Sequence, residues 1–235
     1  MSNRTIAEGV ASMLSLNTPP IGLAFVEAAP KGVETFNAEV PSACTLWRRA
    51  ESQVFYAAAE KHFNCPIGAM TMGFDLPKEV GQQLSGLVQM MCDCGYISGE
   101  EPAKIPGVKK KKSGIVYGPL KDFPLEPDLV LMWLPPRQAM LYNEAVGSIR
   151  WTSTLPATVF GRPACAALPI SFENSQSALS LGCTGMRTFT DIGQDRLLAA
   201  LPGNKASELL NALTATLKSN ATMREFYEQH KARFS

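Results

Sequence analysis

Histidine is scarce in this sequence, and its scarcity argues against several kinds of site. Only two histidines occur among the 235 residues, His62 and His230. Zinc and non-haem iron sites that use several imidazole ligands are therefore disfavoured. A Ser-His-Asp hydrolase is disfavoured as well, unless His62 serves as its base.

Net charge and long apolar runs are also lacking. The formal charge is +1 at pH 7, so no overall electrostatic field attracts nucleic acid or an acidic membrane surface. No stretch approaches the roughly 20 apolar residues that span a bilayer, and the first residues lack the apolar run of a signal peptide. We therefore expect a cytoplasmic protein with no membrane or nucleic-acid partner.

Compact cysteine pairs of the C-x-x-C type are absent, although the chain holds six cysteines. A reducing cytosol keeps such thiols free, so metal binding or redox chemistry is favoured over disulfides. Four of the cysteines are flanked by small or turn-forming residues that leave a sulfur approachable. They are Cys44 in SACTLWR, Cys65 in HFNCPIG, Cys165 in RPACAALP and Cys183 in LGCTGMR.

Soft thiolate ligands select zinc, copper(I) and iron–sulfur clusters, and a cluster requires its sulfurs to converge in space rather than in sequence. The leading hypothesis is an iron–sulfur protein that holds a [4Fe–4S] cluster through Cys44, Cys65, Cys165 and Cys183. Such a cluster would serve electron transfer or small-molecule chemistry at an exposed iron, with Arg48 or Arg187 orienting the substrate.

Two other functions stay open on the residues alone. One is a cofactor-free enzyme in which Cys65 or Cys44 is a nucleophile activated by His62 or by a helix terminus. The other is a haem-binding carrier module that uses His62 with a methionine or cysteine. The sequence does not decide whether the protein is an enzyme. The expected partner is a small molecule or a redox protein, and a homo-oligomer remains open.

Further motifs are weaker candidates. Cys92 and Cys94 form the only close pair, but residues i and i+2 of a helix face different directions and chelate poorly. The glycines of GCTGMR (182–187) allow an anion-binding turn to which Arg187 adds charge, and Arg162 is another candidate for binding a carboxylate or phosphate. The lysine run 109–112 is expected to be a solvated loop.

Apolar periodicity predicts a mixed α/β fold that ends in helices. Strands are expected over 21–26, 115–120, 128–134 and 149–160. Helices are expected over 4–16, 45–62, 77–92, 136–146, 193–201, 204–218 and 221–233. Stretch 64–76 is expected to be a loop, because glycine and proline punctuate it, and stretch 161–172 is punctuated in the same way around Cys165.

The chain is expected to form a single domain over 1–235, and two intimate halves, about 1–120 and 121–235, remain open. Two faint internal similarities suggest a duplicated half. Cys44 and Cys183 share the pattern C-T-x-x-R, and each of Cys65 and Cys165 follows a strand and a helix. In a duplicated protein, cysteines from both halves would meet at a pseudo-twofold interface.

Several segments together resemble the domain-of-unknown-function 169 family of prokaryotic proteins. They are PPIGLAFV, CTLWRRA, AEKHFNCPIGAMTMGF, PDLVLMWLPPRQAML and LSLGCTGMRTF, in an order that spans about residues 15–203. The resemblance implies a soluble prokaryotic protein, of a family often found in anaerobes, whose motif cysteines match Cys44, Cys65, Cys165 and Cys183. It implies no particular activity, and Cys92 and Cys94 fall outside the motif pattern.

Overall fold

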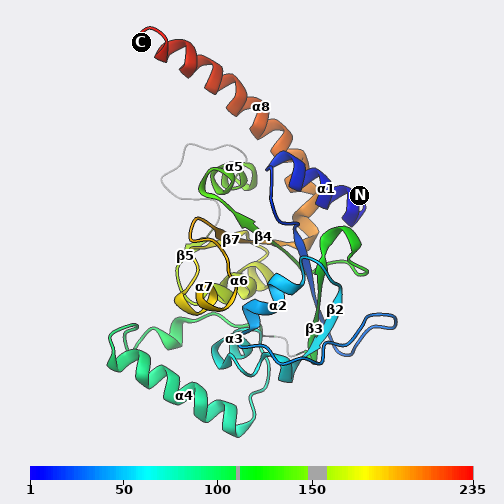
Figure 1. Cartoon of the computed structure of the whole chain (residues 1–235), viewed down its shortest axis with the longest axis vertical. Coiled ribbons are helices and arrows are strands. Elements are labelled where there is room, and N and C mark those ends of the chain that lie inside the picture. Colours follow the sequence, from blue (N-terminus) through cyan, green and yellow to red (C-terminus); the bar gives the residue numbers. More distant parts are fainter. Residues whose placement is uncertain (110–111, 148–157, 235) are drawn as a thin grey trace.

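A seven-stranded sheet with helices on both faces forms the centre of the molecule (Figure 1). The computed structural model describes residues 1–109, 112–147 and 158–234. Its strands are β1 (Ile21–Val26), β2 (Phe55–Ala58), β3 (Gly114–Pro119), β4 (Leu129–Leu134), β5 (Thr158–Phe160), β6 (Ala178–Ser180) and β7 (Leu197–Pro202). This architecture confirms the predicted mixed α/β class.

The helices lie between the strands along most of the chain, and α8 follows the last strand. They are α1 (Asn3–Met13), α2 (Ala43–Arg49), α3 (Pro66–Thr71), α4 (Lys78–Asp93), α5 (Pro136–Val146), α6 (Ala167–Asn174), α7 (Thr184–Phe189) and α8 (Ala206–Lys231). Short 3₁₀ turns include η1 (Ala59–His62) and η4 (Ala164–Ala166). None of the helices in the described part of the chain is long and apolar enough to cross a membrane.

The strand order is β2-β3-β1-β4-β7-β6-β5. Neighbouring strands run antiparallel throughout, except for the edge strand β5, which runs parallel to β6. With the edge strand β5 left aside, the order outward from the centre is β1, β3, β2 in one half and β4, β7, β6 in the other. Apart from β5, the two halves therefore share one strand order. A duplicated origin remains a prediction, as does the domain division.

Strand β4 shows how the two faces are filled. Successive side chains of a strand point to opposite faces, and all six residues of β4 are buried. Leu131 and Trp133 pack in a cluster with residues of α2, α3, α6 and α7, whereas Val130 and Met132 pack in a second cluster with residues of α1, α5 and α8. Burial on both faces explains why this strand is one continuous apolar run.

Two segments leave the body of the molecule in opposite directions (Figure 1). Helix α8 projects beyond the sheet, and every described residue from 221 onward is exposed. Helix α4 lies at the other end of the long axis, and it has no buried residue. The first of these segments ends the chain, and the second lies beside the candidate site described below.

The prediction of one helix over 45–62 is wrong. The chain forms α2, then strand β2, then the turn η1. The recurring apolar residues fit a helix, but Phe55 and Tyr56 pair with Tyr117 and Val116 of β3 instead. Backbone pairing in the sheet outweighs the local preference of this alanine-containing segment.

Other local expectations are also wrong. The expected loop 64–76 contains α3, and the helix expected over 193–201 contains most of β7, which lies between β4 and β6. The punctuated stretch 161–172 contains most of α6. The last two expected helices are one helix, α8. Asn220 lies inside this helix, where its side chain donates to the Thr216 carbonyl of α8 and to Glu144 of α5.

Two expectations fall partly outside the described residues. Of the strand expected over 149–160, only 158–160 are described, and these form β5. Of the lysine run, Lys110 and Lys111 lie outside the described part. Lys112 pairs with Glu27 at 2.6 Å, and the backbone amide of Lys109 donates to Glu173.

Candidate functional site

Four cysteines from distant parts of the chain line one cavity of about 620 Å³. Cys44 lies in the first turn of α2, and Cys65 is the N-cap residue of α3. Cys165 lies in η4, and Cys183 is the N-cap residue of α7. Helices α2, α3, α6 and α7 all contribute to the core on the same face of the sheet, so the topology brings these four sulfurs to one side of the molecule.

The four thiols form a buried pair and a more accessible pair. Cys44 and Cys165 are 6% and 5% exposed, whereas Cys65 and Cys183 are partly buried. With β5 left aside, the buried cysteine of each half lies between its first and second strands (β1 and β2, or β4 and β6), and the accessible cysteine follows the second strand. The fold therefore relates Cys44 to Cys165 and Cys65 to Cys183, which differs from the pairing that the sequence similarities suggested.

Backbone amides surround the two accessible sulfurs. The amide of Met186 donates to the Cys183 Sγ at 3.4 Å. Hydrogen bonds from the backbone of Gly68 and Ala43 reach Cys65 and oppose the rise of its pKa that burial causes. A Cβ at Gly68 would lie 3.1 Å from the Cys65 Sγ, so the missing side chain leaves room for this approach. Such amide donors stabilise a sulfur that carries negative charge.

Without a bound metal, the buried thiols favour their neutral form. Burial raises the pKa of Cys44, and the proximity of Cys165, Cys65 and Cys183 raises it further. Burial also raises the pKa of the Cys165 thiol, and the proximity of Cys65 raises it further. A hydrogen bond with the Thr71 side chain opposes this rise. Each sulfur disfavours a charge on its neighbours, so a cation is needed to hold several thiolates here.

Within the described residues, no three or more His, Cys, Asp or Glu side chains are grouped closely enough to hold a single metal ion. A tetrahedral zinc site requires sulfurs about 2.3 Å from one ion. A cluster is a larger body, since each thiolate binds a different iron and inorganic sulfides separate the irons. Four cysteines spaced around a cavity suit the larger group better than they suit one ion.

His62 does not line this cavity, so it is not placed to act as a base there. It is fully buried, and it is absent from the residues that line the cavity. Its Nδ1 lies 3.0 Å from the Ala58 carbonyl oxygen, to which it donates, and its Nε2 lies 2.9 Å from the Tyr117 hydroxyl. Burial lowers the pKa of His62 to about 4. Both ring nitrogens are therefore engaged, and the imidazole is neutral near pH 7.

The two arginines expected to orient a substrate have other contacts. Arg48 forms an ion pair with Glu51, which also accepts a hydrogen bond from the Trp133 indole. Arg187 donates to three backbone carbonyls, those of Leu181, Gly193 and Arg196. Those three bonds use the Arg187 guanidinium to hold the loop between α7 and β7 against the end of β6.

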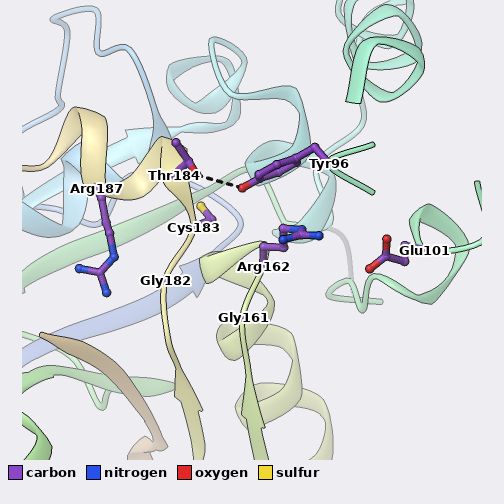
Figure 2. Close-up of a pocket in the computed structure, with 8 residues that line it drawn as sticks. All are labelled: Tyr96, Glu101, Gly161, Arg162, Gly182, Cys183, Thr184 and Arg187. Atoms are coloured by element: carbon purple, nitrogen blue, oxygen red, sulfur yellow. Dashed lines mark hydrogen bonds between the residues drawn. The ribbon is translucent and has the colours of Figure 1, made fainter. Parts of the chain in front are cut away.

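A second cavity, of about 510 Å³, adjoins the first (Figure 2). Arg187 and Cys183 line it, together with Arg162, which the sequence had raised as an anion-binding candidate. Tyr96 and Glu101 also line it, and the sequence did not identify them. Both lie in the segment between α4 and β3, where no local pattern pointed to them.

Cys92 and Cys94 lie apart from these cavities. Cys92 belongs to the last turn of α4, and Cys94 is exposed just after it, with its Sγ donating to the Met91 carbonyl oxygen. Neither cysteine lines the cavity that holds the other four, although Met91 does. The structure thus separates the two neighbouring cysteines from the four dispersed ones.

Comparison with known proteins places the sequence in a family. No solved structure gives a significant match. An uncharacterised protein of Methanocaldococcus jannaschii, MJ0308, is 26% identical over 229 residues, an alignment that covers 89% of this chain and 93% of that protein. The model of the DUF169 family, described as uncharacterised ArCR, matches residues 10–212. This match covers most of the sheet and all four dispersed cysteines, and the chain belongs to the DUF169 family.

Proposed function

We propose that this protein binds a [4Fe–4S] cluster through Cys44, Cys65, Cys165 and Cys183. One observation carries the proposal: four cysteines that are up to 139 positions apart line a single cavity. Free cysteines serve well as small buried residues, but chance burial does not require four of them at one cavity. Iron–sulfur clusters are commonly held by four cysteine thiolates.

The surroundings of the sulfurs support a cluster with one accessible side. Cys44 and Cys165 lie deep in the core, and Cys183 lines both cavities. Amide donors to Cys183 and Cys65 stabilise negative sulfur and tune the reduction potential of a bound cluster. A cluster held in this way would supply an electron or a Lewis-acidic iron, which suits electron transfer or small-molecule chemistry at the cavity.

The two alternative functions draw no support from the contacts of His62. A Cys-His nucleophile needs the imidazole within hydrogen-bond reach of the thiol, yet both nitrogens of His62 are engaged by Ala58 and Tyr117. A histidine that ligates haem iron also needs a free imidazole nitrogen, and His62 has none. The raised pKa values of the Cys44 and Cys65 thiols also oppose a nucleophilic thiolate in the metal-free protein.

The cellular setting follows from the same chemistry. Free thiols and an oxygen-sensitive cluster suit a reducing cytoplasm, so we infer a cytoplasmic protein. Its partner would be a small molecule that enters the cavities or a redox protein that docks beside them. A net charge of +1 favours neither nucleic acid nor an acidic membrane.

The test is purification without oxygen, followed by iron and sulfide analysis and electron paramagnetic resonance of the reduced protein. We expect about four irons and four sulfides per chain, a brown colour and a low-temperature signal of a reduced cluster. Protein that is colourless and free of iron, and that stays so after chemical reconstitution with iron and sulfide, would refute the proposal.

A further inference from the structure

The two cavities meet at four shared residues. Tyr96, Glu101, Arg162 and Cys183 line both the outer cavity and the inner, cysteine-lined cavity. Figure 2 shows Tyr96 and Arg162 next to Cys183, with Glu101 on the other side of the opening. A molecule that reaches the inner cavity from the outer one therefore passes this group of side chains.

Tyr96 and Arg162 contact each other and line one side of this opening. The Arg162 guanidinium carbon lies 4.3 Å from the centre of the Tyr96 ring, a cation–π contact. The Tyr96 hydroxyl donates to the Thr184 Oγ1 at 3.3 Å, which ties the segment after α4 to the start of α7. A guanidinium that lies on a ring keeps its edge N–H groups available to a second partner.

Arg162 is the cation at the opening that is available to a ligand. Among the described contacts, none joins the Arg162 guanidinium to a carboxylate, and its side chain is exposed. Arg187 is held by three carbonyls, and Lys104 pairs with Glu100 at 3.3 Å. Glu101 accepts a hydrogen bond from the Ser98 amide. The N–H groups left to bind an anionic ligand at the opening are therefore those of Arg162.

The inner cavity is apolar away from the cysteines. Its outer wall is made by α4 and the segment after it, which contribute Leu87, Val88, Met91, Ile97 and Ile105. No residue of α4 is buried, so these side chains are only partly covered by the protein itself. An apolar body in the cavity would remove this surface from water, and the volume of about 620 Å³ lies in the range of small-molecule sites, about 300–1,000 Å³.

We propose that the joined cavities bind an amphipathic organic anion. Its carboxylate or phosphate is bound by Arg162 on the ring of Tyr96, and its apolar body lies against the α4 wall. The ligand then reaches the cysteine-lined cavity beside Cys183. Its role as a substrate rests on the proposed cluster, but its binding does not, because every contact invoked here is made by the protein chain.

The test is isothermal titration calorimetry on the full chain with octanoate as probe. Octanol, which lacks the charge, and acetate, which lacks the apolar body, are the comparison ligands. We expect octanoate to bind at least about tenfold more tightly than either, because both a charge-assisted hydrogen bond and apolar burial contribute. Equal binding of octanol and octanoate, or no binding of octanoate, would overturn the proposal.

Variants locate the binding. We expect Arg162→Gln to weaken octanoate binding about tenfold while leaving octanol unchanged. Arg137→Gln is the matched control, since Arg137 is exposed on α5 and lines neither cavity. Val88→Gln should weaken octanoate binding. Val80→Gln should not, because Val80 lies on the same helix but does not line the inner cavity. Thermal unfolding verifies that each variant is folded, and controls that lose as much affinity as the site variants would overturn the proposal.

Iron analysis of the same samples separates this inference from the proposed cluster. Protein that contains iron but does not bind octanoate would retain the cluster and refute the anion site. Protein that stays free of iron after reconstitution with iron and sulfide but binds octanoate through Arg162 would retain the anion site and refute the cluster.

Discussion

Cys65 and Cys183 occupy corresponding positions in the two halves of the sheet. Each is the N-cap residue of the short helix that follows β2 or β6, the second strand of its half when the edge strand β5 is left aside, and each has a backbone amide donor to its sulfur. Cys44 and Cys165 correspond in the same way, since each lies between the first and second of these strands. The proposed cluster would therefore take one buried and one accessible ligand from each half.

Replacing any one of the four cavity cysteines should lower the amount of bound cluster more than replacing both Cys92 and Cys94. We expect each of the four single Cys→Ser variants, prepared without oxygen, to lose most of its bound iron or to hold it in a labile form, because a thiolate ligand is lost. The Cys92→Ser/Cys94→Ser double variant is the control, since neither residue lines the cavity. Iron and sulfide analysis gives the result, and iron loss confined to the control would contradict the ligand assignment.

Alkylation should distinguish the buried from the accessible thiols. In metal-free Cys92→Ser/Cys94→Ser protein near pH 7, we expect iodoacetamide to modify Cys183 well before Cys44 or Cys165. The reason is that Cys183 lines the outer cavity, whereas burial covers Cys44 and Cys165 and raises their pKa values. Peptide mass mapping of a time course measures the order. Early modification of Cys165 would show that this thiol is accessible in solution and would contradict the expected order.

Prior loading with iron and sulfide is the companion experiment to this alkylation series. It should protect Cys183 if this cysteine is a ligand, because a coordinated sulfur is no longer a free nucleophile. Unchanged labelling of Cys183 in protein that holds its full complement of iron would exclude Cys183 from the ligand set.

The buried His62 should make the metal-free protein less stable in mild acid. Its pKa is lowered from 6.5 to about 4 in the folded state, so the unfolded chain binds more protons between these values. The stabilisation is complete above pH 6.5 and is lost as the pH falls toward 4. Between pH 7 and pH 5 we expect a loss of about 2 kcal/mol in the free energy of unfolding, given about 1.36 kcal/mol per pKa unit.

Urea unfolding of wild type, His62→Gln and His230→Gln at both pH values measures this effect. His62→Gln should reduce the difference between pH 7 and pH 5, while His230→Gln, at an exposed position on α8, should leave it unchanged. A pH dependence that persists in full without His62 would assign it to other groups.

The end of α8 should contribute little to the stability of one chain. Every described residue after 220 is exposed, including Phe226 and Tyr227, so a chain ending at Ala221 should unfold within about 0.5 kcal/mol of the full protein. Leu213→Ala, at a fully buried position of the same helix, should cost about 2–5 kcal/mol. Thermal unfolding with light scattering compares them. A truncation as costly as Leu213→Ala would indicate that this helix packs in an oligomer.

The local sequence pattern correctly predicted those elements whose apolar residues recur with a single, unambiguous period. The continuous apolar run of β4 lies within one residue of its predicted range, and the amphipathic repeat of α1 begins one residue earlier and ends three residues earlier than its predicted range. Strands β2 and β7 were mistaken for helix, because short segments rich in alanine and leucine fit either period and only their sheet neighbours decide. Tyr96 and Glu101 could not be identified, since nothing adjacent to them in the chain indicates the cavities they line.

The amino-acid sequence by itself determined the mixed α/β class, the family and the presence of four cysteines at the ends of elements, because these follow from local composition, spacing and motif order. Only the tertiary structure decided that the four sulfurs share a cavity and that His62 is withdrawn from it. Both depend on contacts between residues far apart along the chain, such as His62 with Tyr117 and Arg162 with Tyr96, and strand order rather than local pattern sets those contacts.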